Sequence, residues 1–566
     1  MTSYNQLSLR EGYWIILLLF SFHCFTAKVY SQDIESIGKE KPLKISGAFG
    51  TTQTFYTTDG IPLRRPPYQW VFTGNLNVDI YGLSIPISGF WSNQNREVRQ
   101  PFNQYGVSPR YKWLIAHAGY RNLSFTPYTL AGHTFLGVGA EATPGIFRFG
   151  AMYGRLNKAV EEDTINSGNN PPSFRRIGYG IKAGIGKDGN FFDVIFFKAK
   201  DDINSLKNIP IASDVKPAEN MVLSLNMQKR LGKRTLLSLE YANSFYTRDT
   251  RSPKKESAGT FSNLYTQNQS SQLFSAFKSA LTYSGNFYSI AMGYERIEPE
   301  YRTLGAYFFN NDLENITVSP SIRLWKDKIN LNANVGLQRN NVNNNKMTTT
   351  RRVLSSFNIN YIPAPKWTFS GMYSNFTSYN RISNRFDRFQ TLDTLNFYQV
   401  NENINFNAGY NNSGKTLRHG IMLNSAYQGA NETYGENVTS NKALFFNLNG
   451  SYQLGMIPSE TNLAIGISSN KNIVAGRETL AWGPTAMMGK TFWDKQLRTS
   501  INAFYNNVIT DGKSTGKAIN TVLSCGYNYL KKNTFTLNLM LLNRKGDTEA
   551  NSFTEFTGTF GYMYNF

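Results

Sequence analysis

The chain of 566 residues carries a formal net charge of +21, is 14% aromatic and 17% charged, and contains two cysteines. This composition excludes a disordered chain, a disulfide-rich scaffold and a coiled coil. The mean hydropathy of -0.39, together with the lack of any apolar run of about 18 residues, excludes a helical membrane protein. A β-rich chain outside the cytoplasm remains.

The first residues have the order of a secretory signal peptide. Arg10 precedes an apolar stretch from Trp14 to Phe25, and Val29-Tyr30-Ser31 places small or medium side chains at the end of a cleavage site. An anchor helix is the alternative, but this stretch rises only about 18 Å against roughly 30 Å of hydrocarbon. We predict that residues 1–31 are a signal peptide and that residues 32–42 form a short periplasmic segment.

From residue 43 onwards the dominant pattern is the alternation of apolar with polar side chains, which is typical of strands with one apolar face. The stretch 70–80 alternates in this way, turns at Tyr81-Gly82, and alternates again over 83–91. Lys187-Asp188-Gly189-Asn190 is a second strong turn signal between two alternating stretches. The chain therefore reads as a series of antiparallel hairpins.

The pattern predicts eleven short turns, near residues 81, 144, 188, 232, 285, 327, 363, 414, 458, 494 and 532. The spacing after the second turn fits one strand out, a loop of variable length and one strand back, because membrane strands need roughly 9 to 11 residues. These turns predict 24 strands, within a range of 22 to 26. Residues 122–133 do not fit a strand, and we expect them to fold into the lumen.

Three other all-β architectures are alternatives to a barrel. Tandem β-sandwich domains would show a linker roughly every 100 residues, and none is visible. A propeller would show repeats of four strands, whereas the unit here has two strands of diverged sequence. Alternation alone leaves a phage-like fibre open.

The end of the chain favours a membrane barrel over these alternatives. One face of the final segment is almost entirely aromatic, since counting back in twos gives Phe566, Tyr564, Tyr562, Phe560, Gly558 and Phe556. This segment resembles the closing strand of Gram-negative outer-membrane β-barrels, and its terminal Tyr-Met-Tyr-Asn-Phe resembles the signal that the outer-membrane assembly machinery reads. The resemblance covers residues 43–566. It implies a single closed antiparallel barrel in contact with membrane lipid and lipopolysaccharide.

Basic residues are the most informative polar feature. Arg148 alternates with Phe147 and Phe149, and Lys182 with Ile181, so both should face the lumen, because a cation facing lipid at mid-depth costs roughly 2 to 4 kcal/mol. We assign Arg148, Lys182, Arg121 and Arg155 to an anion-favouring lumen, and Arg64, Arg65, Arg96 and Arg99 to the rim, beside lipopolysaccharide phosphates. The dispersed charge argues against nucleic-acid binding.

The sequence predicts no catalytic, cofactor or metal site. Without the signal peptide Cys525 is the only cysteine, and the histidines are too far apart in sequence for a zinc motif. His133, in the irregular segment, is the only candidate for an outer-membrane hydrolase. The stretch from Gly409 to Thr416 matches a phosphate loop, but strand-like alternation follows it where that motif needs a helix.

We therefore expect a non-enzymatic pore or transport channel whose wide lumen is constricted by infolded loops, such as 94–110 and 122–133. The few residues before the first strand leave no room for the plug domain of a TonB-dependent receptor. The alternative is an accessory barrel of a surface-protein secretion or attachment complex. In that case loops 157–174 and 248–271 would contact an envelope protein partner.

Overall fold

The computed structural model describes residues 43–94, 100, 103–162, 172–208, 215–255, 265–345, 351–378, 399–434, 439–548 and 551–566. The predicted signal peptide, the segment 32–42, Arg96 and Arg99 lie outside these residues. Within the described part of the chain, no helix has the length and apolar character needed to cross a membrane.

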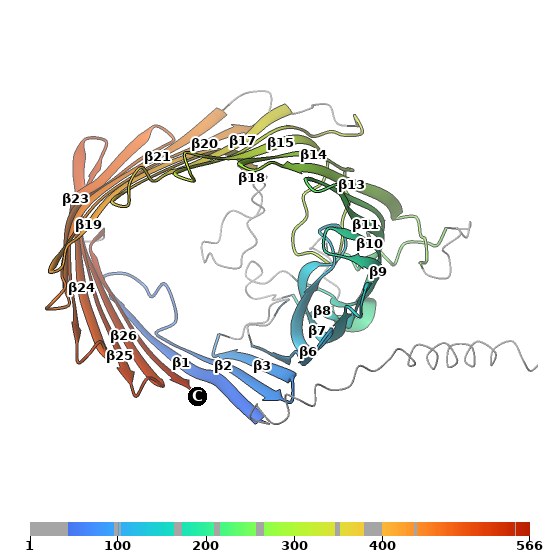
Figure 1. The fold of residues 1–566 in the computed structure, drawn as a ribbon, viewed down its shortest axis with the longest axis horizontal. Coiled ribbons are helices and arrows are strands. Elements are labelled where there is room, and N and C mark those ends of the chain that lie inside the picture. Colours follow the sequence, from blue (N-terminus) through green and yellow to red (C-terminus); the bar gives the residue numbers. More distant parts are fainter. Residues whose placement is uncertain are drawn as a thin grey trace, which may run out of the picture.

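All strand segments belong to one antiparallel sheet in which sequence neighbours pair. The sheet closes because β1 pairs with β27, from Ala48 opposite Asn565 to Asp59 opposite Thr554, and Figure 1 shows the resulting ring. The segments are β1 (Leu43–Asp59), β2 (Tyr68–Ile80), β3 (Leu83–Ser92), β4 (Gln104–Val107), β5 (Arg110–Tyr111), β6 (Leu114–Ser124), β7 (Ala131–Ala142), β8 (Phe147–Asn157), β9 (Arg175–Lys187), β10 (Asn190–Asp202), β11 (Glu219–Leu231), β12 (Thr235–Thr247), β13 (Ser271–Ser284), β14 (Tyr288–Ile297), β15 (Leu313–Leu324), β16 (Ile329–Arg339), β17 (Arg351–Tyr361), β18 (Trp367–Ser378), β19 (Gln399–Ser413), β20 (Leu417–Tyr434), β21 (Thr439–Met456), β22 (Thr461–Val474), β23 (Arg477–Phe492), β24 (Leu497–Thr510), β25 (Lys513–Tyr529), β26 (Asn533–Gly546) and β27 (Phe553–Asn565), with one 3-10 turn, η2 (Ile203–Ser205).

The segments β4 and β5 occupy one position in the ring, because both lie between β3 and β6. The 27 segments therefore form a closed barrel of 26 strands. This number lies at the upper limit of the predicted range of 22 to 26 and exceeds the predicted 24 by two, because the turn at Lys112-Trp113 was missed. Neither residue is a usual turn former, and Lys112 adopts the left-handed backbone conformation, with a φ of 50°. The strands β4 and β5 also show that residues 104–107 and Arg110, at the end of the segment expected to fold inward, are part of the wall.

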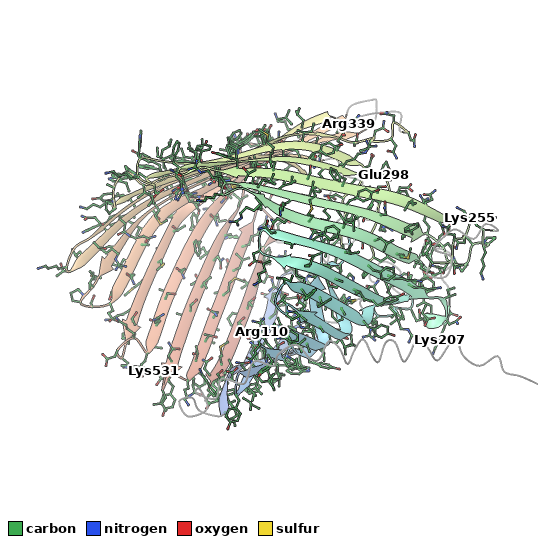
Figure 2. All side chains as sticks on the ribbon, turned by 45° about the vertical axis from the view of Figure 1, so that its right-hand side comes forward. Arg110, Lys207, Lys255, Glu298, Arg339 and Lys531 are labelled. Atoms are coloured by element: carbon green, nitrogen blue, oxygen red, sulfur yellow. The ribbon has the colours of Figure 1, made fainter. Side chains whose placement is uncertain are left out.

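The two ends of the barrel differ in their connections. One end, called the turn end, carries the short predicted turns and the turn at Lys112-Trp113. The other end, called the loop end, carries the longer connections, including 125–130 and 298–312. In Figure 2, Arg110 and Lys531 mark the turn end, while Lys207, Lys255, Glu298 and Arg339 mark the loop end. Short periplasmic turns and longer outer loops are typical of outer-membrane barrels.

The strands place apolar side chains on the outer face, as the alternation predicted. On β22, for example, Ile465 and Ile467 are 65% and 55% exposed and point outward, while Ser468 points inward. An apolar outer band on a closed sheet satisfies both lipid contact and backbone hydrogen bonding in a bilayer. The protein is an integral outer-membrane β-barrel.

The terminal aromatic face also lies outside, at the seam between the first and last strands. Phe566 stacks on Phe49 with ring centroids 5.7 Å apart and on Tyr564 at 5.9 Å. The Phe566 N–H donates to the Gly47 carbonyl at 3.1 Å, and the Gly47 N–H donates to the Phe566 carbonyl at 3.3 Å. The last residue therefore closes the barrel at its turn end.

Candidate functional site: the lumen

Two connections at the loop end fold into the barrel: loop A (residues 125–130) and loop B (residues 298–312). Loop A covers inward positions of β8 and β9, where a β-carbon on Gly150 or Gly180 would approach the Phe125 ring to 2.8 Å or 2.9 Å. The inward folding expected for residues 122–133 is therefore confirmed for their central part. The flanking residues belong to β6 and β7. Figure 1 shows loop B, which follows β14, turned to the inside of the ring.

Loops A and B hold each other in place. Leu130 forms a parallel bridge with Gly305, and the Tyr301 hydroxyl donates to the Tyr128 carbonyl at 2.8 Å. The Thr303 hydroxyl donates to the Thr129 carbonyl. These contacts join residues more than 170 positions apart in the sequence.

The loops bury an apolar cluster against the inner wall. It comprises Leu123, Tyr128, Leu130, Phe135, Met152, Leu156, Phe197, Ala199, Ala218, Val222, Ala242, Tyr246, Ala276, Ile297, Tyr301 and Leu304. Apolar burial of this kind stabilises by roughly 25 cal/mol per Å² removed from water. One side of the lumen, along β6 to β14, is therefore filled by a packed core rather than by water.

Polar contacts anchor loop A inside this core. The Tyr128 hydroxyl donates to Glu295 Oε1 at 2.5 Å. Burial is the main cause that raises the pKa of both the Tyr128 and Tyr301 hydroxyls, followed by nearby carboxylates. Both phenols therefore stay neutral at physiological pH and keep donating these hydrogen bonds.

The structure places three of the four predicted lumen cations on the inner face. Arg148 pairs with the buried Asp193 through two contacts of 2.8 Å and 3.1 Å. Lys182 lies 5.5 Å from the Phe125 ring centroid, and Arg121 donates to the Ser88 hydroxyl at 2.8 Å. The alternation thus identified the direction of Arg148 and Lys182.

Arg155 does not face the lumen. It lies opposite Leu136 and its guanidinium donates to the Tyr120 hydroxyl at 3.0 Å, on the outer face. Arg155, Phe147 and Tyr153 are separated by even numbers of residues and therefore lie on the same face of β8. The alternation thus already indicated that Arg155 faces outward. The lumen assignment of Arg155 was wrong for this reason.

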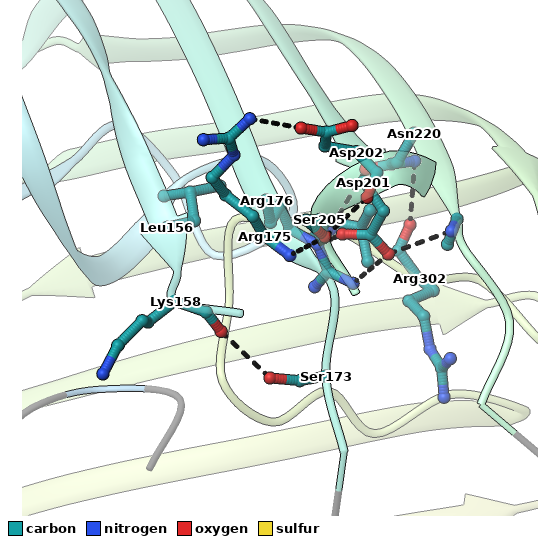
Figure 3. Close-up of polar contacts among 12 residues, drawn as sticks. Leu156, Lys158, Ser173, Arg175, Arg176, Asp201, Asp202, Ser205, Asn220 and Arg302 are labelled. Carbon is teal, nitrogen blue, oxygen red and sulfur yellow. Dashed lines mark hydrogen bonds and ion pairs between the residues drawn. The ribbon is translucent and has the colours of Figure 1, made fainter. Parts of the chain in front are cut away.

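Carboxylates offset other inward cations as well. Arg176 binds Asp201 through contacts of 2.8 Å and 2.9 Å, and Figure 3 shows this pair beside the Arg175–Asp202 pair. Lys278 lies between Glu240 and Glu295 in the strand register. These carboxylate partners come from other strands, so the sequence pattern around each arginine does not indicate them.

Replacing Arg148 with glutamine is expected to leave Asp193 buried without its cation. Removing one partner of a buried pair costs about 3 to 5 kcal/mol, so the thermal midpoint of the barrel should fall. The reversal potential under a salt gradient should also move towards cation preference. The double variant Arg148→Gln with Asp193→Asn should recover most of the loss in both measurements. Failure of that recovery would contradict the pairing.

The two described rim arginines turn inward. Arg64 lies 3.6 Å from Glu555 and 4.8 Å from the Phe553 ring, and Arg65 lies 4.8 Å from the Tyr56 ring. These partners occupy inward positions of β27 and β1.

Outward cations near the loop end were missed in the sequence. Lys198 and Lys200 bind the two oxygens of Glu219 at 3.0 Å and 3.1 Å. Both lysines lie on the same face of β10 as Val194 and Phe196, which face lipid. Their spacing from these apolar residues was the sequence signal that could have identified them as outward cations.

The opposite side of the lumen has a different chemistry. The inward positions of β19 to β25 carry mainly amides and hydroxyls, and we call this surface the amide wall: Asn403, Asn405, Asn407, Asn424, Gln428, Asn447, Asn449, Ser451, Ser468, Asn470, Thr485, Asn502, Asn506, Asn520 and Ser524. Among the described side chains of these strands, the charged residues at inward positions are Arg418, Arg477, Arg498 and Lys513. Each is the first or second residue of its strand. The middle of the wall is uncharged.

The described histidines have structural partners. His133 is 3% exposed and stacks on Tyr307 of loop B at 4.1 Å. His117 lies between Ser108, at 3.0 Å from Nδ1, and Glu141, at 3.2 Å from Nε2. A catalytic triad has the opposite arrangement, with serine at Nε2 and the carboxylate at Nδ1. Among the described residues no group of three or more His, Cys, Asp or Glu could hold a metal ion.

The phosphate-loop match forms no such loop. Gly409 lies in β19, the chain turns after Ser413, and β20 begins at Leu417. A strand follows the turn where nucleotide binding needs a helix N-terminus.

No protein-family model matches the chain, and no curated protein sequence matches it. Among solved structures, the outer membrane protein OpdK from Pseudomonas aeruginosa aligns with 9% identity and a TM-score of 0.30, covering 62% of this chain and 94% of OpdK. The FrpB iron transporter from Neisseria meningitidis aligns with 10% identity and a TM-score of 0.36, covering 95% of this chain and 83% of FrpB. A mutant of the ferric enterobactin receptor PfeA from Pseudomonas aeruginosa aligns with 9% identity and a TM-score of 0.37, covering 92% and 80%.

Proposed function

We propose that this barrel is a loop-constricted channel that passes small polar solutes across the outer membrane. The observation that carries the proposal is the packing of loops A and B on one side of the lumen, opposite a polar wall. Barrels of about 16 to 18 strands already hold an aqueous channel, and those near 22 carry a plug. A ring of 26 strands needs an element that narrows it, and the two loops supply one.

We further propose a weak preference for anions. Two inward cations support it: Arg121 contacts the Ser88 hydroxyl, and Lys182 lies over the Phe125 ring. Neither contact neutralises the charge, whereas Asp193 offsets Arg148. The preference should be modest, because several other lumen cations face carboxylates.

For lipopolysaccharide we propose the outward cations at the loop end, Arg155, Lys198 and Lys200, in place of Arg64 and Arg65. Their side chains lie on the outward face of the strands, near the loop end. Cations at that level can bind phosphate groups by charge-assisted hydrogen bonds.

Recording current from purified barrel in a planar bilayer under a salt gradient tests the channel. We expect a stable conductance with a small anion-directed reversal potential. Silence from correctly folded protein would contradict the channel and favour the accessory role. Co-purification of a second envelope protein would then be the next observation to seek.

A further inference from the structure

The amide wall has the chemistry of a surface that binds hydroxyl groups. Each asparagine presents an N–H₂ donor and a carbonyl acceptor, and neighbouring strands bring these amides side by side. The Asn424 amide donates to the Asn407 carbonyl oxygen, and Asn407 donates to the Ser370 hydroxyl at 3.3 Å. A neutral hydroxyl can replace such contacts one for one, whereas an ion finds no counter-charge there.

A recess of about 480 Å³ lies in this wall, lined by residues that include Asn449, Asn470, Thr485, Phe504, Asn506 and Asn520. It is large enough to hold a sugar of one or two rings.

Phe504 is an aromatic ring set among these amides. It lies opposite Thr485 on one side and Asn520 on the other, and it is 37% exposed at an inward position. Asn520 Oδ1 is covered and has no hydrogen-bond partner among the described residues. An aromatic face beside a few convergent polar groups is the usual composition of a small-molecule site. The flat apolar face of a pyranose ring fits against the phenyl ring while its hydroxyls meet the amides.

We propose that the recess around Phe504 is a subsite for neutral sugars, so that the channel favours uncharged polyhydroxylated solutes over charged ones of equal size. This inference rests on the proposed channel function and names its solute class. Ion selectivity and sugar binding are then separate properties of the lumen. The cations of β6 to β9 determine the selectivity for inorganic ions, and the amide wall binds sugars.

The test uses full-length protein in liposomes and planar bilayers. Liposome swelling should be about threefold faster with glucose than with gluconate or glucosamine, because neither charged solute finds a counter-charge on the wall. Maltotriose should block single-channel current in a saturable way. Phe504→Ala should raise the dissociation constant for this block about tenfold, the loss of one ring contact, and Phe504→Tyr should retain the block.

The matched control is Phe445→Ala, which removes an inward phenylalanine that is not part of the recess lining. It should leave the maltotriose block unchanged. Heat-modifiable gel migration verifies folding of each variant. If Phe504→Ala does not fold, Asn506→Leu removes an amide from the same recess and should weaken the block.

The outcomes separate the two proposals. A folded protein that conducts, but swells equally fast with glucose and gluconate and shows no maltotriose block, would overturn the sugar subsite and leave the channel standing. Block that Phe504→Ala and Phe445→Ala weaken equally would also overturn the subsite. Absence of conductance and of swelling from folded protein would overturn the channel itself.

Discussion

Replacing Tyr301 with alanine is expected to release loop B and raise single-channel conductance about twofold or more, in proportion to the widened path. Tyr301 is fully buried, lies 5.0 Å from the Phe309 ring and donates to the Tyr128 carbonyl. Removing a buried aromatic side chain costs about 3 to 5 kcal/mol. Tyr301 lies in loop B and not in a strand, so its loss should release the loop before it destabilises the barrel wall.

Planar-bilayer recording measures the change in conductance, and a thermal melt separately measures the loss of stability. Tyr529→Ala is the matched control, because Tyr529 is 48% exposed at the turn end and far from both loops in the strand order. Tyr301→Phe keeps the ring and removes only the hydroxyl, so it should change conductance little. Unchanged conductance in Tyr301→Ala, despite a lower melting temperature, would mean that loop B does not narrow the path.

Deleting Phe566 is expected to reduce the amount of assembled barrel about tenfold, the equivalent of roughly 1.4 kcal/mol. The deletion removes the reciprocal backbone hydrogen bonds with Gly47 and the ring that stacks on Phe49 and Tyr564. It also removes the last residue of the proposed assembly signal, which includes Phe560 and Tyr562. Heat-modifiable migration in isolated membranes measures the assembled fraction.

Phe49→Ala separates packing at the seam from the proposed signal. It removes the stacking partner of Phe566 but leaves the C-terminal strand intact. If the terminal residue acts as a signal, the deletion should reduce assembly much more than Phe49→Ala does. Equal reductions would mean that the ring acts only through packing.

Alternation predicted the strands and their faces, because lipid imposes the same requirement on every strand, and the aromatic final segment was needed to favour a membrane barrel over other all-β folds. It placed Arg148 and Lys182 inside without any knowledge of pairing. The strand number was less certain because a turn such as Lys112-Trp113 carries no glycine, proline or amide residue. A period-two pattern through 43–566 therefore specifies faces better than it specifies strand ends.

The lumen was less predictable because its contacts are non-local. Tyr128 and Tyr301 meet across 173 positions, and no pattern within either loop indicates the other. The same reason hid Asp193 as the partner of Arg148, although Arg148 had the expected direction. The asparagines of the amide wall alternate with apolar residues in the sequence. They form one continuous polar surface only because several strands lie side by side.

The packing of loops A and B gives the ring two kinds of wall. Along β10, neighbouring residues are apolar on both faces: Val194 faces lipid, while Ile195 and Phe197 are buried within the lumen core. This arc is a double layer, and the described part of the arc from β19 to β25 is a single sheet. A double layer resists bending more than a single sheet, so a change in bilayer thickness or lateral pressure deforms mainly the thin arc. We therefore expect membrane tension to deform first the arc that carries the amide wall.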